Sequence, residues 1–309
     1  MLTTPVVGVL SKAGYEVHFL SKAQYAEILL ANPRIDRVWT IEDKIAEVLS
    51  ALQEENFYKV LDLHDNLRSV RVRKTLGVPT AIFDKQKVSN FLWTKFGLKT
   101  SASPSILSRF LKTAEGLDGV EASAPLEFPI PPMTRKAIEK YELPSKYYCI
   151  AVGAAWKTKQ LPLHKIQEVL DGLPSENIIL LGGPKELYLT EGLTLGPMVR
   201  NLVGQLSIIE TGAIIERATA LLSGDTGVMH IAAALGTPIV AIFGSTHPDM
   251  GYAPYSKEGG SQPVLIQHES LECRPCTKHG KKSCPKGHFK CMEELDMADV
   301  VEALSVFGT

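Results

Sequence analysis

The feature that most constrains this chain is a regular alternation of short apolar runs with longer amphipathic stretches over nearly all of its 309 residues. The apolar runs have the length of strands, and the stretches between them have the length of helices. Strands that alternate with helices in this way build βαβ units around a parallel sheet. The sequence therefore predicts an α/β protein.

The expected strands lie at 17–20, 37–40, 58–63, 81–83, 147–152, 178–181, 199–203, up to 222, and 239–243. The expected helices lie at about 22–31, 43–54, 66–76, 87–116 with a break at 101–105, 134–141, 162–172, 185–191, 206–217, 226–235 and 296–306. A proline-rich stretch over 122–132 interrupts the alternation. It predicts two domains, 1–143 and 144–309.

Charge and hydropathy exclude several classes of protein. Lys and Arg number 33 and Asp and Glu number 34, so the net charge of −1 excludes a globally basic nucleic-acid binder. No apolar run approaches the roughly 18–20 residues of a membrane span. The first residues carry no basic region like that of a signal peptide, and four of five cysteines crowd into 273–291. These features favour a protein of the reducing cytosol.

The stretch 219–246 carries the strongest chemical signal. An apolar strand runs into Gly224-Asp225-Thr226-Gly227, and a helix rich in small residues follows. Such a turn presents free backbone N–H groups and the positive end of a helix dipole, which suit an anion, with Asp225 or Thr226 as the expected helix cap. Thr226 and His230 are four residues apart and share one helix face. The alternative is an ordinary βαβ turn with a capping carboxylate.

Two further turns are expected at the carboxyl ends of strands in the same domain. One follows Val152 and carries Lys157 and Lys159 before a helix that Pro162 starts, so ammonium groups suited to a diphosphate lie beside a helix N-terminus. The other reads Gly182-Gly183-Pro184-Lys185-Glu186. Each is weak alone, since lysines on loops are usually solvated and Gly-Gly-Pro is often only a turn. Their shared placement predicts one ligand site, because open α/β sheets bind ligands at strand carboxyl ends.

Basic and cysteine-rich segments suggest partners. Arg68 and Arg71 share a face of the helix expected at 66–76, with Arg73 and Lys74 nearby, and this face suits an anionic acceptor or is simply solvated. The loop 273–290 carries six basic residues including Arg274 and no acid, which favours an anionic partner or a membrane surface. The spacing of Cys273, Cys276, Cys284 and Cys291 is compatible with a structural zinc, with free thiols or a disulfide as alternatives.

The segment from Asp225 to Pro238, running on to Phe243-Gly244-Ser245-Thr246, closely resembles the signature of glycosyltransferase family 9, the ADP-heptose:lipopolysaccharide heptosyltransferases. Further resemblance lies in 2–7, in 62–69, in Lys159 with Pro162, in 182–186 and in the cysteine-rich loop with Cys291-Met292. The resemblance implies the GT-B fold, two Rossmann-like domains facing a cleft. It also implies an N-terminal acceptor domain and a C-terminal nucleotide-sugar domain.

The resemblance implies a metal-independent transfer of heptose, with inversion, from ADP-heptose to an anionic lipopolysaccharide-core acceptor, in the cytoplasm and at the inner face of the inner membrane. Peripheral membrane contact and no nucleic-acid partner are expected. By position, the donor-binding residues would be Lys159, Glu186, Asp225, Thr226, Gly227 and His230. Arg68 and Arg71 would face the acceptor, and no catalytic metal or other cofactor is implied, in keeping with the lack of an Asp-x-Asp pair.

The resemblance also implies a first strand ending in a Gly-Asp turn whose aspartate acts as general base, and nothing in the sequence matches it. The expectation is therefore a truncated 309-residue form that binds donor and turns over slowly, with no residue assigned as base. Two alternative functions remain. One is transfer of another nucleotide sugar to a surface glycan, and the other is non-catalytic binding of a sugar nucleotide.

Overall fold

The structure, a computed structural model, describes residues 1–99, 102–121, 123–257 and 259–308. The chain divides into two compact units, Met1–Lys87 with Pro104–Pro129 and Val88–Ser103 with Ile130–Thr309. This division differs from the expected boundary at 143/144. Residues 88–103 pack with the second unit because the Trp93 ring lies 5.0 Å from the His247 ring and Ser103 N–H donates to the Asp249 carbonyl over 2.8 Å.

Residues 130–143 also belong to the second unit. They form α7 (Pro132–Ala137) and the 3-10 helix η4 (Ile138–Tyr141), and α7 packs against α9 (Ile208–Glu216). The Arg135 guanidinium donates two hydrogen bonds to the Glu216 carboxylate, at 2.7 and 2.8 Å. The chain passes from the first unit to the second between Pro129 and Ile130, which lies inside the proline-rich stretch but not at the expected residue.

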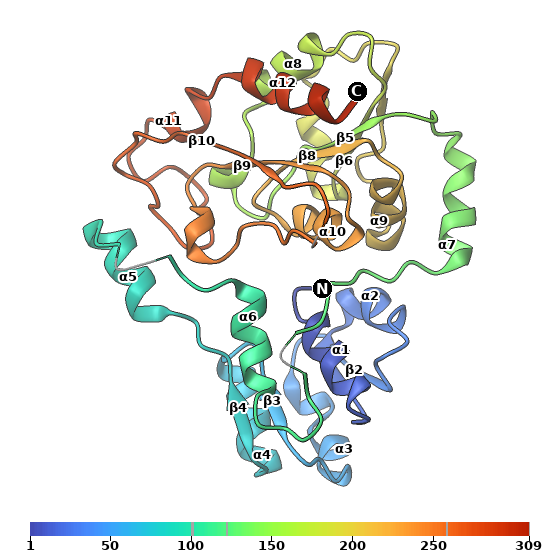
Figure 1. Cartoon of the computed structure of the whole chain (residues 1–309), viewed down its shortest axis with the longest axis vertical. Helices are drawn as coiled ribbons and strands as arrows, with labels where there is room; N and C mark the ends of the chain where they lie inside the picture. The colour runs from blue at the N-terminus through green and yellow to red at the C-terminus, as the bar shows by residue number, and fades with distance from the viewer. Residues whose placement is uncertain (100–101, 122, 258, 309) are drawn as a thin grey trace. The chain divides into compact units, whose positions relative to one another are not determined.

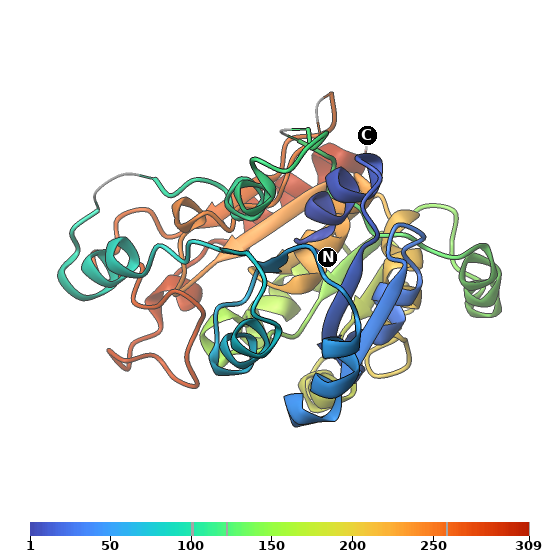
Figure 2. The ribbon, with the colours of Figure 1, turned by 90° about the horizontal axis from the view of Figure 1, so that it is seen from below.

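The second unit is built on a six-stranded, fully parallel sheet (Figures 1 and 2). Its strands are β5 (Tyr148–Ala151), β6 (Ile178–Leu181), β7 (Val199–Asn201), β8 (Ala220–Gly224), β9 (Ile239–Phe243) and β10 (Val264–Gln267). Their spatial order is β10-β9-β8-β5-β6-β7. Renumbered within the unit this order is 6-5-4-1-2-3, the doubly wound Rossmann order.

Helices cover both faces of this sheet, which explains why its strands read as continuous apolar runs. Figure 1 shows α8 (Leu163–Gly172) and α12 (Met297–Gly308) on one face and α9 and α10 (Gly227–Leu235) on the other. On the first face, Ile150 and Val152 pack with Val169 of α8 and with Val300 and Leu304 of α12, all at most 1 % exposed. The remaining elements are η5 (Lys157–Lys159), η6 (Pro184–Leu189), η7 (Pro248–Met250), α5 (Lys87–Phe96) and α11 (Lys290–Glu293).

The first unit contains two separate two-stranded parallel sheets. One pairs β1 (His18–Lys22) with β2 (Arg37–Ile41), and the other pairs β3 (Val60–Asp62) with β4 (Thr80–Ile82). Its helices are α1 (Thr4–Lys12), η1 (Ala23–Tyr25), α2 (Ala26–Leu30), η2 (Ile45–Glu47), α3 (Leu49–Glu54), α4 (Leu67–Leu76), α6 (Ile106–Leu111) and η3 (Lys112–Ala114). The side chains of Ile41, Ile45, Leu49 and Val72 form a small core between β2, α3 and α4.

Most expected elements are present, with shifts of a few residues at their ends. The expected helix at 185–191 is the 3-10 helix η6, and the expected helix at 22–31 divides into η1 and α2. The edge strand β10 was not expected, because only three apolar residues precede Gln267 in it and the loop before it is polar. No helix in the described ranges is both long and apolar enough to span a bilayer.

Candidate functional site

The predicted ligand turns lie at the topological switch point of the six-stranded sheet. Strands β5 and β8 are neighbours there, and the chain leaves them in opposite directions along the sheet. The turn after β5 leads to Lys159, and the turn after β8 contains Asp225. Ligands of doubly wound folds bind at this position, outside the carboxyl ends of the two strands. The two turns also touch, because a Cβ on Gly224 would lie 2.5 Å from the Lys159 carbonyl oxygen.

A buried ion pair joins the two turns. The Lys159 ammonium lies 2.9 Å from Asp225 Oδ2, with side chains 15 % and 7 % exposed. Asp225 Oδ2 also accepts a hydrogen bond of 2.8 Å from the Thr246 hydroxyl, which follows β9. Three successive strands of the sheet, β5, β8 and β9, thus each place one polar group here. An ammonium has three donors, so Lys159 can keep Asp225 and still donate to an anion.

His230 lies one turn into α10, close to this pair, and is 5 % exposed. Burial lowers the pKa of His230 to about 4; the Asp225 carboxylate raises it in part, and Lys159 adds a smaller lowering. The imidazole is therefore neutral at pH 7. Within the described part of the chain, its buried Nδ1 has no hydrogen-bond partner. Buried polar atoms are nearly always paired, so this nitrogen is available to a ligand.

The start of α10 has no side-chain cap within the described residues. Thr226 occupies the N-cap position in an extended conformation, but its hydroxyl lies 3.0 Å from the Ser223 hydroxyl. The Asp225 carboxylate is engaged by Lys159 and Thr246. The expectation that Asp225 or Thr226 caps the helix with its side chain is therefore wrong. The consequence favours an anion site, because the positive end of α10 is not neutralised by a cap and Gly227 is exposed.

The glycine-rich turn after β6 joins the same neighbourhood through Glu186 of η6. A Cβ on Gly153 would lie 2.2 Å from Glu186 Cγ, and one on Gly183 would lie 2.8 Å from Glu186 Oε2. The Glu186 side chain therefore lies across two glycines, one after β5 and one after β6. Residue 153 must be glycine for this close approach, because any side chain there would overlap Glu186.

The cysteine-rich loop supports the site from outside. Lys281 N–H donates to the Thr158 hydroxyl over 2.8 Å, and Thr158 N–H donates to the Lys281 carbonyl over 3.1 Å. The Ser245 hydroxyl donates to the same Thr158 hydroxyl over 2.9 Å. Residues 158, 245 and 281 thereby fix the backbone next to Lys159. Sequence reasoning missed this support because its partners are up to 123 residues apart.

Arg274 is a structural residue, which corrects its expected role as part of a basic surface for an anion or membrane. Its guanidinium donates to the carbonyls of Phe243, Thr246 and His268 at 2.7, 3.1 and 2.6 Å, and burial lowers its pKa. These carbonyls belong to β9 and to the segments that follow β9 and β10. Arg274 therefore holds the segment that brings Thr246 to Asp225, and its charge is not available to a partner.

The four clustered cysteines are the residues for which the sequence left a structural zinc, free thiols or a disulfide open. In the ranges that the structure describes, no group of three His, Cys, Asp or Glu side chains is arranged to hold a metal. Cys291 is buried in the core beneath α12, and burial raises its pKa to about 12. Cys276 Sγ lies 3.8 Å from the Ser245 carbonyl oxygen, and Cys273 Sγ lies 3.8 Å from His288 Nε2. The four clustered thiols nevertheless lie near one another, because Cys273 and Cys284 add to the raised pKa values of both Cys276 and Cys291, and all five cysteines are free.

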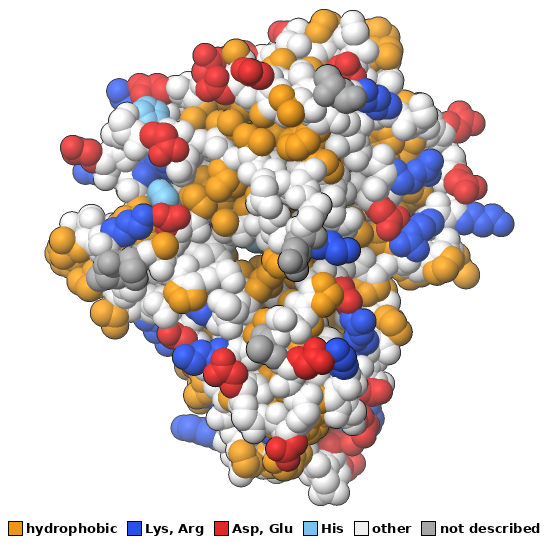
Figure 3. Space-filling view, in the orientation of Figure 1, with side chains coloured by type: hydrophobic (Ala, Val, Ile, Leu, Met, Phe, Trp, Pro, Cys, Tyr) orange, Lys and Arg blue, Asp and Glu red, His pale blue; other side chains and the backbone are white. Residues whose placement is uncertain are grey.

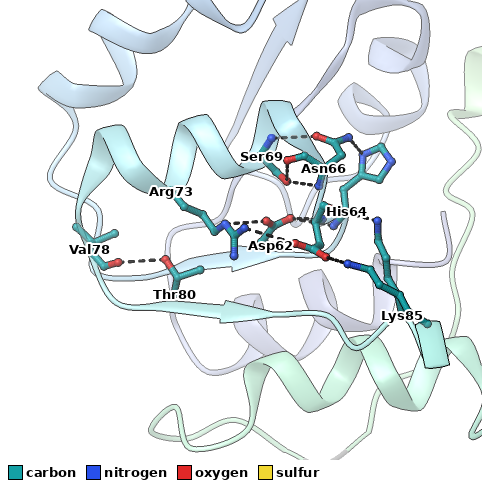
Figure 4. A network of polar contacts seen from close by, with 10 residues as sticks. Asp62, His64, Asn66, Ser69, Arg73, Val78, Thr80 and Lys85 are labelled. Atoms are coloured by element: carbon teal, nitrogen blue, oxygen red, sulfur yellow. Dashed lines mark hydrogen bonds and ion pairs between the residues drawn. The ribbon is translucent and has the colours of Figure 1, made fainter. Parts of the chain in front are cut away.

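In the first unit, the carboxyl end of β3 carries a polar network around Asp62 (Figure 4). Asp62 is 4 % exposed, accepts from the N–H groups of His64 and Asp65 at 3.0 and 2.7 Å, and lies 3.0 Å from the Arg73 Nε. Asp65 pairs with Lys87 at 2.8 Å, and its carbonyl accepts from Lys85 at 2.8 Å. Arg73 of α4 is therefore held by two carboxylates.

The helix that follows this network, α4, is fully capped. Asn66 Oδ1 accepts from Ser69 N–H at 3.0 Å, and the Ser69 hydroxyl accepts from Asn66 N–H at 2.8 Å. Because Oδ1 is committed to the cap, Asn66 Nδ2 faces His64 Nδ1 at 3.0 Å. Nδ2 only donates, so His64 Nδ1 accepts and the ring proton is on Nε2. Arg68 and Arg71 remain exposed on α4.

The structure thus brings together Lys159, Asp225, Thr226, Gly227 and His230 at one end of the second sheet, with Glu186 on the neighbouring turn. Arg68 and Arg71 lie in the other unit. The cysteine-rich loop contributes Arg274 and the contacts of Lys281 with Thr158. The residues that sequence reasoning missed are Ser245, Thr246 and Thr158, and the hydroxyls in Gly244-Ser245-Thr246 next to a strand end were the available signal.

Comparison with known proteins places this geometry in a family. Residues 45–286 match the family model described as glycosyltransferase family 9 (heptosyltransferase). Lipopolysaccharide heptosyltransferase 3 of Escherichia coli is 23 % identical over 277 residues, which cover 80 % of either chain. Lipooligosaccharide heptosyltransferase 2 of Haemophilus influenzae is 35 % identical over 80 residues, which cover 26 % of this chain and 22 % of that protein.

Solved structures share the fold over nearly the whole chain. A family 9 glycosyltransferase from Veillonella parvula superposes with a TM-score of 0.76 at 20 % identity, covering 99 % of this chain and 92 % of that one. The ADP-heptose lps heptosyltransferase II of E. coli superposes with a TM-score of 0.72 at 18 % identity, covering 99 % and 94 %. The fold is of the GT-B class, with two Rossmann-like α/β domains. The chain belongs to glycosyltransferase family 9, the heptosyltransferase family, and is a glycosyltransferase.

Proposed function

We propose that this protein transfers heptose, with inversion and without a metal ion, from ADP-heptose to an anionic acceptor in the inner core of lipopolysaccharide. The observation that carries the proposal is the buried Lys159–Asp225 pair at the switch point, beside a neutral His230 with a free Nδ1 and the uncapped start of α10. An exposed glycine and a lysine at such a helix start suit a diphosphate.

Each donor contact has a chemical role in this proposal. Lys159 donates to the diphosphate, and the backbone of Thr226 and Gly227 at the start of α10 holds further phosphate oxygens. Asp225 keeps the Lys159 ammonium in place, and His230 Nδ1 orients the donor. Glu186, which lies across Gly153, contacts the nucleoside. The Lys159 ammonium and the positive end of the α10 dipole stabilise the negative charge that develops on the leaving ADP, so the reaction needs no divalent cation.

The acceptor belongs to the first unit in this proposal. Arg68 and Arg71 are exposed on α4 and can pair with phosphate or carboxylate groups of the acceptor. The acceptor hydroxyl attacks the anomeric carbon, the bond to ADP breaks, and the hydroxyl proton leaves to a base. Asp62 and Asp65 are held by Arg73 and Lys87, so we assign that role to neither. We place the reaction at the cytoplasmic face of the inner membrane.

Calorimetry of the whole chain with ADP and with ADP-heptose in EDTA tests donor binding, and mass spectrometry of the acceptor tests transfer. We expect binding in EDTA and a mass increase of one heptose. A strict requirement for a divalent cation would contradict the metal-free site. Faster transfer from another nucleotide sugar would favour a different surface-glycan enzyme, and binding with no transfer from any donor would favour a sugar-nucleotide-binding protein.

A further inference from the structure

The helix α5 buries Trp93 and Asn90 on one face and exposes several large apolar side chains on the other. Val88, Phe91 and Phe96 are 73 %, 54 % and 64 % exposed, and Leu98 just beyond the helix is 59 % exposed. On the inner face, Asn90 is only 4 % exposed. Large apolar side chains at positions i, i+3 and i+8 form one stripe along a helix. A contiguous exposed stripe of this kind marks an interaction surface.

The inner face of α5 is anchored, so the orientation of the stripe is fixed within the second unit. Trp93 is 8 % exposed, and its ring lies 5.0 Å from the ring of His247. The Lys99 ammonium lies 5.1 Å from the centre of the Trp93 ring and pairs with Asp249. On the outer face the rings of Phe91 and Phe96 contact each other edge to face at 5.9 Å. Figure 3 shows orange side chains along the outer edge of α5.

Charge complementarity indicates what covers the stripe. Residues 85–99 contain Lys85, Lys87, Lys95 and Lys99 and no acidic residue. Lys95 is exposed within the stripe. Lys87 and Lys99 at its two ends pair with Asp65 and Asp249, but their side chains stay 70 % and 42 % exposed, so anionic headgroups can still reach them. Phenylalanine side chains flanked by lysines on a short helix suit the interface of a bilayer with anionic lipid headgroups.

We propose that α5 is a membrane-docking helix that inserts Val88, Phe91 and Phe96 into the headgroup region of an anionic bilayer. The proposal rests on the proposed function in one respect, since a lipid-anchored acceptor has to be reached at a membrane surface. The docking surface is therefore α5 and not the basic loop 273–290 that the sequence favoured. In that loop Arg274 is occupied by backbone carbonyls.

Sedimentation of the whole chain with vesicles tests the docking without donor or acceptor. We expect binding to vesicles of phosphatidylglycerol and phosphatidylethanolamine and little binding to phosphatidylcholine. The double variant Phe91→Ser/Phe96→Ser should partition at least about tenfold less, and Lys95→Glu should lose roughly tenfold on anionic vesicles alone. The control Met133→Ser/Tyr188→Ser removes side chains that are 82 % and 62 % exposed elsewhere on the second unit and should bind as wild type does.

Equal binding by wild type and the Phe91→Ser/Phe96→Ser variant, or no binding by wild type, would overturn the proposal. A concentration-dependent dimer in ultracentrifugation that this variant abolishes would assign the stripe to a second copy and would also overturn it. Transfer to a deacylated, water-soluble acceptor reports on the proposed function separately. Normal transfer without vesicle binding rejects the docking helix, and vesicle binding without transfer rejects only the proposed function.

Discussion

Two strand–turn–helix units, one in each half of the molecule, both contain a buried aspartate paired with a cation, but they differ in whether the turn is left open to a ligand. β3 leads into α4 through Asp62, and β8 leads into α10 through Asp225. Both aspartates are buried, at 4 % and 5 % exposure, and each pairs with a cation, Arg73 at 3.0 Å or Lys159 at 2.9 Å. The difference lies in what remains unsatisfied. Asp62 accepts two backbone N–H groups and α4 is capped by Asn66, whereas α10 has no side-chain cap within the described residues.

A buried aspartate at a strand end therefore does not by itself mark a ligand site. Around Asp62 the Arg73 guanidinium pairs with the charge, at 3.0 Å from an Oδ2 that makes no hydrogen bond with the described residues, and Asn66 caps the helix terminus. Among the described residues, the Asp225 turn instead keeps a lysine with spare donors, a histidine nitrogen without a partner and a helix end without a side-chain cap. The first turn should therefore respond to mutation mainly in stability and the second mainly in binding.

The largest effect should come from breaking the Asp62 turn. Asp62→Asn leaves the largely buried Arg73 with only the more distant Asp65 carboxylate, at 3.4 Å, and should lower the free energy of unfolding by about 3 kcal/mol. Urea unfolding measures this change, and ADP affinity of the folded variant should be unchanged. Lys87→Ala, which removes the exposed partner of Asp65, is the control and should change stability by less than about 1 kcal/mol. Lost ADP affinity in folded Asp62→Asn would break the comparison.

Lys159→Ala should weaken ADP binding by about 1.5–3 kcal/mol, because one charge-assisted contact to the diphosphate is lost. Lys157→Ala is a matched control, since Lys157 lies in the same 3-10 helix but is exposed. Calorimetry should show wild-type affinity for the control. Equal weakening by both variants would mean that general positive charge, not the Asp225-held ammonium, attracts ADP.

His230 should make stability depend on pH. Its pKa is about 4 in the folded protein against an ordinary 6.5, so the unfolded chain takes up this proton first as pH falls. The free energy of unfolding should therefore fall as pH drops from 6.5 towards 4, by about 2 kcal/mol between pH 7 and 5 from this residue. His230→Gln should reduce that slope and the exposed His164→Gln should not. A slope unchanged in His230→Gln would show that the imidazole is not buried and neutral.

The smallest expected change in stability comes from the side chains at the starts of α4 and α10. Asn66→Ala removes a cap from α4 and should cost about 1 kcal/mol of stability. Thr226→Ala removes no cap and should cost clearly less, while weakening ADP binding because Thr226 lies at the proposed phosphate site. Thermal unfolding with and without ADP measures both. A larger stability loss for Thr226→Ala would show that its hydroxyl does cap α10.

Sequence patterns predicted those elements whose signal is local. The strands 178–181 and 239–243 are found at the expected residues, because helices on both faces select unbroken apolar runs. Strand β10 was missed, since an edge strand needs few apolar residues. Residues 88–103 group with the second compact unit and not with the first as expected, because the contacts of Trp93 with His247 and of Lys99 with Asp249 leave no local pattern in the sequence.

The same distinction applies to the site. The turns that carry Lys159, Glu186 and Asp225 were predicted to converge because parallel strands end at one edge of a sheet. The contacts that hold them were not, since Arg274 and Lys281 come from a loop whose basic composition suggested a surface. Composition indicates that a charge is present, but only the tertiary structure decides whether backbone carbonyls already use it.

Two hydrogen bonds with Lys281 hold Thr158, and they determine when the site can form during translation. Thr158 precedes the anion-binding lysine by one residue, but its partner is translated 123 residues later. A nascent chain can therefore pair β5, β6 and β8 on the ribosome while Asp225 already holds Lys159 but the hydrogen bonds between Lys281 and Thr158 are still missing. Nucleotide affinity should be acquired only near the end of translation, so prematurely released fragments would be unable to sequester ADP-sugars from the finished enzyme.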